Sequence, residues 1–105
     1  MTDPIAALHA RFQASFPEKR SDLLAALAGW RDTPQSTDRI AALYLLTHKL
    51  AGSAGAYGFD TLAARARSAD QLLQPIARGG ERAESDRVAA IDAAVVALCS
   101  ALAAA

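Results

Sequence analysis

Apolar residues recur every three or four positions along most of the chain, a spacing typical of amphipathic helices. No segment alternates apolar and polar residues in the way that a half-buried strand requires. The pattern therefore predicts an all-α protein with five helical stripes. These stripes are Ile5, Leu8 and Phe12; Leu23, Leu24, Leu27 and Trp30; Ile40, Leu43, Leu46, Leu50 and Ala54; Leu62, Ala66, Ala69 and Leu73; and Val88, Ile91, Val95, Leu98 and Leu102.

Capping and turn residues divide these stripes into separate helices. Asp3 before Pro4 is a start signal, since proline at the first helical position loses no hydrogen bond. The predicted bounds are Asp3-Pro4 to Phe16-Pro17; Glu18 to Thr33-Pro34; Ser36 or Thr37 to Gly58; Asp60 or its neighbour to Pro75; and Ser85 or Asp86 to a C-terminus that frays over residues 103–105.

Four long helices with short connections favour an antiparallel four-helix bundle, because each apolar stripe must find partners. The short first helix is then expected to cap one end of the bundle. The 105 residues suffice for a single domain, 1–105. One bundle buries its own stripes, so we expect a monomer.

Composition narrows the functional class. Eleven basic and eleven acidic residues are interspersed and give no net charge, so a nucleic-acid-binding face is not expected. The uninterrupted apolar stretches are far shorter than the ~20 residues that span a bilayer, and the N-terminus lacks a leader pattern. With Cys99 as the single cysteine, we expect a reducing, cytoplasmic location without membrane association. Two histidines without a ligand constellation predict no metal site.

His48 lies in the middle of the third predicted helix. At about 100° per residue, the apolar residues of that helix cluster on one side, and His48 points roughly 150° away from their centre. Its helical neighbours are Tyr44 one turn before and Gly52 one turn after. Ala41, Ala51 and Gly55 complete the surface predicted around the imidazole.

The two glycines are costly in a helix interior, by up to about 1 kcal/mol each relative to alanine. They are explained if another molecule must approach the imidazole closely. Glycines in an alanine-rich helix can also be points of helix–helix packing, and by periodicity alone a lone mid-helix histidine is more often a surface residue without a function. Periodicity alone leaves these alternatives open.

The segment from Thr47 to Phe59, followed by Leu62, resembles the signature of histidine-containing phosphotransfer (HPt) domains. In that family the phospho-accepting histidine is followed by leucine after two residues, glycine after four, a small residue next, and a second glycine after ten. The matching positions here are His48, Leu50, Gly52, Ser53 and Gly58. The predicted bundle matches the family fold over essentially the whole chain.

The resemblance implies a phosphorelay carrier and not a kinase. It implies that His48 accepts a phosphoryl group at Nε2 and exchanges it with aspartates in the receiver domains of response regulators. Sensor or hybrid histidine kinases are the other expected partners. We expect no cofactor in this chain, and Mg²⁺ in the receiver domain, because this sequence has no acidic cluster suited to the metal. It also lacks a glycine-rich phosphate loop for ATP.

One position departs from the family pattern. The family commonly has lysine three residues after the histidine, where this chain has Ala51. Lys49 is offset from His48 by about 100° on a helix, so its ammonium must curl back to reach a phosphate. The residues expected to support the phosphoryl group are Lys49, Gly52 and Ser53.

Partner docking is expected on small and apolar residues beside His48, namely Ala41, Tyr44, Leu45, Ala51 and Gly55. Leu45 fits a packing role at the bundle edge equally well. Arg65 and Arg67 on the next helix fit either solvated surface charges or contacts to the phosphate or the partner. The rival hypothesis is an HPt-like adaptor that binds a kinase or receiver without carrying phosphate, and the displaced lysine favours it.

Overall fold

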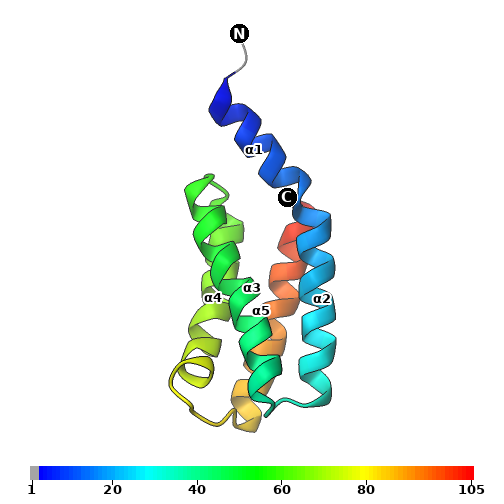
Figure 1. The fold of residues 1–105 in the computed structure, drawn as a ribbon, viewed down its shortest axis with the longest axis vertical. Coiled ribbons are helices and arrows are strands. Elements are labelled where there is room, and N and C mark those ends of the chain that lie inside the picture. The colour runs from blue at the N-terminus through cyan, green and yellow to red at the C-terminus, as the bar shows by residue number, and fades with distance from the viewer. Residues whose placement is uncertain (1–2) are drawn as a thin grey trace.

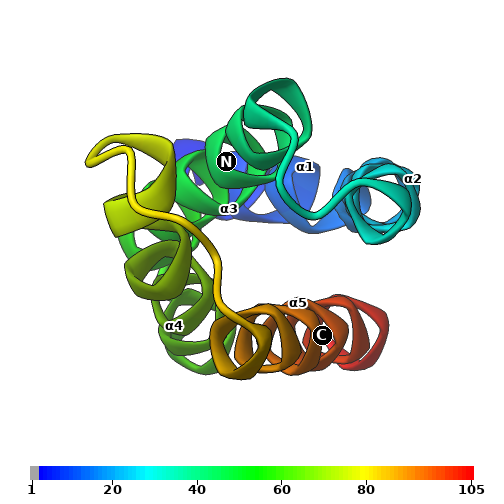
Figure 2. The same cartoon turned by 90° about the horizontal axis from the view of Figure 1, so that it is seen from below.

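The computed structural model describes residues 3–105. Met1 and Thr2, which belong to the N-terminal segment where no leader is expected, lie outside the described residues. The described chain forms helices α1 (Pro4–Ala14), α2 (Phe16–Asp32), α3 (Thr37–Ala56), α4 (Asp60–Ala77) and α5 (Ser85–Ala104). Helices α2 to α5 run alternately down and up (Figure 1) and stand at the four corners of a bundle (Figure 2). The predicted all-α four-helix architecture is confirmed.

The core runs along the axis of this bundle. Each of α2 to α5 packs against two neighbours, in the ring α2, α3, α4 and α5. Burying a leucine or isoleucine side chain stabilises the fold by about 1.5–3 kcal/mol. The largest fully buried side chains are Trp30, Leu23, Leu27, Leu43, Leu73, Ile91, Leu98, Val95 and Thr47. Leu24, assigned to the α2 stripe by periodicity, is instead exposed, because it lies one residue beyond Leu23 and turns away from the core.

Helix α3 has well-formed caps at both ends. At its start, the Ser36 hydroxyl accepts a hydrogen bond from the Arg39 N–H at 3.3 Å. At its end, Gly58 adopts a φ of +80°, and the Phe59 N–H donates to the Ala54 carbonyl at 2.9 Å. This is the Schellman arrangement, in which a glycine in the left-handed conformation ends the helix. The predicted start and stop of this helix are confirmed.

Helices α1 and α2 are separated by Ser15 alone. The second helix begins at Phe16, two residues before the predicted Glu18. Pro17 causes this difference. Proline in the first turn needs no intrahelical hydrogen-bond donor and therefore does not delay the start of the helix.

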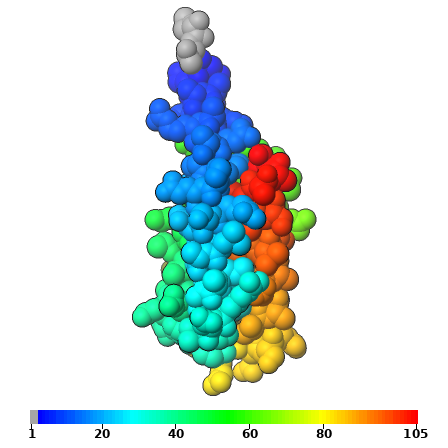
Figure 3. Space-filling model, turned by 90° about the vertical axis from the view of Figure 1, so that its right-hand side faces the viewer, coloured from blue at the N-terminus to red at the C-terminus, as the bar shows by residue number. Residues whose placement is uncertain are grey.

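The second half of α1 covers one end of the bundle. The Phe12 ring stacks on Tyr57 with centroids 4.7 Å apart, and the His9 ring stacks on Phe59 at 4.3 Å. The first half projects beyond the bundle (Figure 3). Its exposed apolar residues are Ile5 and Leu8. The capping role predicted for this helix is therefore filled by its last turns.

Helix α4 continues through Pro75 to Ala77, so the prediction that Pro75 limits the helix is wrong. Proline removes one hydrogen bond between successive turns of a helix. Because Pro75 lies in the last turn of α4, this loss does not interrupt the helix. The turn beyond includes Gly80, with a φ of +69°, and the Glu81 N–H donates to the Pro75 carbonyl at 3.1 Å.

Helix α5 begins at Ser85 after an N-cap at Glu84 and extends to Ala104. Residues 103 and 104 belong to this helix, and Ala105 lies beyond its end. By length and composition, α5 is also apolar enough to cross a membrane. Its mean hydropathy is high because alanines and short apolar runs fill most of its length, although polar residues interrupt those runs. The core helix of a soluble protein meets the same criterion, and α5 buries Ile91, Val95 and Leu98.

Cys99 lies on the buried side of α5 and is 3% exposed. Burial raises the pKa of its thiol, an effect that the charge of Arg20 only partly offsets. A raised pKa disfavours the reactive thiolate. Cys99 is therefore a packing residue.

Candidate functional site

His48 projects from the middle of α3 into solvent. Its side chain is 58% exposed, which confirms the outward orientation predicted by helical periodicity. The ring stacks on Tyr44, one turn earlier, with centroids 5.4 Å apart and planes inclined by 30°. The imidazole is thus supported on one side and accessible from outside the bundle.

Asp70 of α4 contacts the His48 ring. The Asp70 Oδ1 lies 3.1 Å from the His48 Nδ1, and the Asp70 side chain is only 15% exposed. An ionised carboxylate accepts hydrogen bonds but does not donate them, so this contact requires the proton on Nδ1. In the neutral ring, Nε2 then keeps its lone pair. With an ionised carboxylate, the pair therefore holds the ring proton on the nitrogen that faces Asp70 and leaves the other nitrogen open.

Sequence reasoning missed Asp70. A signal was nevertheless present, because His48 and Asp70 lie equal numbers of residues before and after Phe59 in the α3–α4 turn. In an antiparallel helix pair with a short turn, such residues lie at the same level. Which of the residues at that level face each other depends on how the two helices are rotated.

Gly52 and Gly55 continue the surface of α3 away from His48. The three residues lie within about 60° of each other around the helix axis, and we call them the glycine strip. A Cβ built on Gly52 would have no neighbour within 4 Å. Close helix packing therefore does not explain Gly52, and an approaching partner meets bare backbone there.

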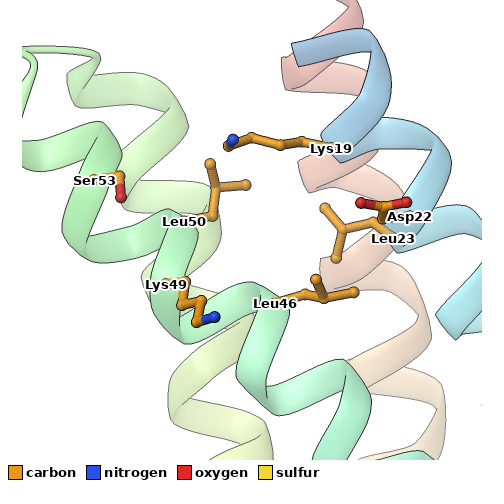
Figure 4. A pocket seen from close by; sticks show the side chains of 7 residues that line it. All are labelled: Lys19, Asp22, Leu23, Leu46, Lys49, Leu50 and Ser53. Carbon is orange, nitrogen blue, oxygen red and sulfur yellow. The ribbon is translucent and has the colours of Figure 1, made fainter. Parts of the chain in front are cut away.

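Lys49 and Ser53 lie on a different side of α3. Both line a cavity of about 240 Å³ between α2 and α3, together with Lys19 and Leu46 (Figure 4). Ser53 is about 140° around the helix from His48. Of the three residues predicted to support a phosphoryl group, only Gly52 shares the surface of the imidazole.

The structure places all but one of the predicted docking residues on the surface around His48. Ala41, Leu45 and Gly55 are exposed, and Tyr44 is half-buried. Ala51 is only 9% exposed, so its assignment to the docking surface is wrong.

The reason lies in the packing of α3 against α4, its most extensive helix contact. The buried residues of α4 on this level are mainly alanines, whose small side chains permit a close approach. The buried stripe of α3 consequently widens toward α4 and includes Thr47 and Ala51. Periodicity centred on the leucines did not include this side.

His9, the other histidine, is exposed on α1 and stacks on Phe59. Among the described side chains, no carboxylate forms an ion pair with His9 in the way that Asp70 does with His48. Within residues 3–105, no group of three or more His, Cys, Asp or Glu side chains is arranged to hold a metal ion.

The fold and the site together define a helical bundle that presents one exposed, carboxylate-paired imidazole on the surface of its second long helix. The family model described as Hpt domain matches residues 7–105. The chain therefore belongs to the Hpt domain family. Domains of this family are phosphoryl carriers in two-component signalling, not kinases, and they interact with histidine kinases and response regulators in phosphorelays. No curated protein matches the chain.

Proposed function

We propose that His48 is the phospho-accepting residue of this carrier and that Nε2 is the atom that bonds to phosphorus. The observation that supports this most directly is the contact between Nδ1 and the Asp70 carboxylate at 3.1 Å on a ring that is otherwise open to solvent. That contact leaves the Nε2 lone pair directed away from Asp70.

The donor in the accepting direction is an aspartyl phosphate in a receiver domain. The Nε2 lone pair forms a bond to phosphorus while the P–O bond to the aspartate breaks, and the electron pair of that bond leaves with the carboxylate. The ring keeps its proton on Nδ1 and becomes positively charged. Phosphoryl transfer depends chiefly on such positioning and on neutralising charge.

Asp70 stabilises this product by its charge. The neutral ring already donates a charge-assisted hydrogen bond to the carboxylate, and the contact gains the attraction of opposite charges when the ring becomes cationic. The reverse transfer, to a receiver aspartate, passes through the same arrangement. Asp70 thus acts as a positioning residue for both directions of flow.

The exposed residues beside His48 fit a receiver domain as the docking partner. Ala41, Leu45 and the glycine strip offer small and apolar surface around the imidazole. The receiver supplies Mg²⁺ and the acidic residues that hold it. We place the carrier in the cytoplasm, as a monomer, between a sensor or hybrid kinase and a response regulator.

A second candidate function is an adaptor that binds a kinase or receiver without accepting phosphate. Two observations favour it: Ala51 is buried where the family commonly has lysine, and Lys49 lines the cavity on the other side of α3. The intact pair of His48 and Asp70 favours the carrier.

The test is phosphoryl transfer from a panel of phosphorylated receiver domains. We expect an acid-labile, base-stable label on the wild-type chain, its loss in His48→Gln, and its retention in the matched variant His9→Gln. Label that persists in His48→Gln would contradict the site assignment. Receivers that bind the wild-type chain without labelling it would establish the adaptor instead.

A further inference from the structure

A phosphoryl group on His48 brings up to two negative charges to a surface that already holds the Asp70 carboxylate. The single positive charge that the ring gains is already paired with Asp70, so the phosphoryl charges stay uncompensated unless a further cation lies within a few ångströms. The position of the usual lysine is filled by the buried Ala51, and Lys49 lines the cavity facing α2. A compensating cation must therefore come from another position.

Arg67 lies on the correct side of α4. It is three residues before Asp70, which places it about 4.5 Å along the helix axis and about 60° around it. Because α4 runs antiparallel to α3, Arg67 is displaced from the level of His48 in the direction of Gly52. The Arg67 side chain is thus anchored beside the glycine strip, on the same side of the bundle as the imidazole.

The guanidinium already leans over the strip. Its Nη1 lies 3.9 Å from the place where a Cβ on Gly55 would be, whereas a Cβ on Gly52 would meet nothing within 4 Å beyond its chain neighbours and the backbone of its own helix. Gly52, which lies between Gly55 and His48 on this surface, therefore presents no side chain that would stand in the way of the guanidinium. Arg67 is exposed, and the three ion pairs found within residues 3–105 do not include it.

We propose that Arg67 is the phosphate-binding cation of this domain and that it turns back across Gly52 to pair with the phosphoryl group on His48. The inference rests on the proposed role of His48. It also gives the two glycines a shared function, since side chains at either position would obstruct the path of the guanidinium. Arginine suits the task because its planar group donates two parallel hydrogen bonds to phosphate oxygens.

Arg65 provides a matched control on the same helix. It is exposed like Arg67, but it lies about 140° around α4 from Asp70. There it lines a surface depression with Asp60, Thr61 and Ser68. Arg65→Gln therefore removes the same charge from the same helix without touching the glycine strip.

The experiment phosphorylates the chain chemically with phosphoramidate, which needs no receiver, and follows the phosphohistidine by ³¹P NMR. The His48→Gln variant identifies the His48 signal and separates it from any signal of His9. The measured quantity is the pH midpoint of the ³¹P shift, at which the phosphohistidine loses the proton that its ring carries at Nδ1. A nearby guanidinium disfavours the protonated ring and lowers this midpoint.

In Arg67→Gln the midpoint is expected to rise by about three quarters of a pH unit at low ionic strength, as for charges about 4 Å apart in water. Arg65→Gln should match the wild-type chain. The difference should shrink near 1 M salt, where the screening length falls to about 3 Å. Equal midpoints in the wild type and Arg67→Gln would overturn the inference, and so would a rise in Lys49→Gln in place of Arg67→Gln.

These outcomes are separable from those of the transfer assay. Receivers that fail to label a chain whose ³¹P midpoint depends on Arg67 would reject only the proposed carrier function. Normal labelling by receivers, with a midpoint that does not depend on Arg67, would reject only the role of Arg67.

Discussion

The two histidines of this chain lie in contrasting surroundings, although both are exposed on helices. His9 stacks on Phe59 at the end of the bundle, whereas His48 sits in mid-helix with Asp70 on its Nδ1 and bare glycine backbone beyond it. In the first arrangement the imidazole serves as a packing surface for an aromatic ring. The second places a carboxylate on one nitrogen and leaves the other open, and the proposed role of His48 as a nucleophile rests on this arrangement. Exposure alone therefore does not distinguish the two histidines, whereas their neighbours do.

The largest effect is expected from closing the open side of His48. Gly52→Leu places a branched side chain in empty space, so the fold persists while a docking partner is held away. We expect the rate constant of transfer from a phosphorylated receiver to fall by about a hundredfold, since displacement by 1 Å has that effect on well-aligned reactions.

The control for this variant is Ala42→Leu, which adds the same side chain to an exposed position of α3 about 120° around from His48. It should transfer at the wild-type rate. A Gly52→Leu protein that still transfers normally would mean that partners do not approach along the glycine strip.

The second largest effect is expected from removing the charge of Asp70, the carboxylate that His48 has and His9 lacks. In Asp70→Asn the neutral amide still accepts from Nδ1, but it lacks the charge that stabilises the cationic ring. The difference between charged and neutral hydrogen bonds corresponds to about a tenfold loss in the transfer rate. ¹⁵N NMR should show the proton of neutral His48 on Nδ1 in the wild type and redistributed in Asp70→Asn, with His9 as the unchanged internal reference.

Asp60→Asn, in the first turn of the same helix, is the matched charge control and should leave both the rate and the His48 spectrum unaltered. A wild-type spectrum with the His48 proton on Nε2 would contradict the assigned orientation of the ring.

A smaller effect is expected on stability when Gly52 is replaced by alanine, because glycine lowers the stability of a helix. Gly52→Ala adds a methyl group that meets nothing, so the folded state should gain about 0.5–1 kcal/mol from the higher helix propensity of alanine. Urea unfolding monitored by circular dichroism measures this gain. A loss of stability would show that Gly52 makes a packing contact after all.

The smallest effect concerns the stacked histidine. His9→Ala removes one exposed ring from the cluster around Phe59, at an expected cost of about 0.5 kcal/mol in the free energy of unfolding. Phosphoryl transfer should be unchanged, and thermal unfolding together with the transfer assay tests both halves. Reduced transfer in this variant would break the contrast between the two histidines.

The sequence by itself determined the five helices, the antiparallel order and the exposure of His48, because helical periodicity and capping depend on residues a few positions apart. It also contained the spaced residues around His48 and Gly58 that identify the family. Its errors at the start of α2 and at Pro75 come from proline, which interrupts a helix less near its ends than in its interior.

Only the tertiary structure decided which residues of neighbouring helices meet. The rotation of α3 against α4 buried Ala51, turned Lys49 and Ser53 toward α2, and brought Asp70 and Arg67 to the side of His48. These relations are set by how alanine-rich surfaces pack along the whole length of two helices. No local pattern within either helix contains them.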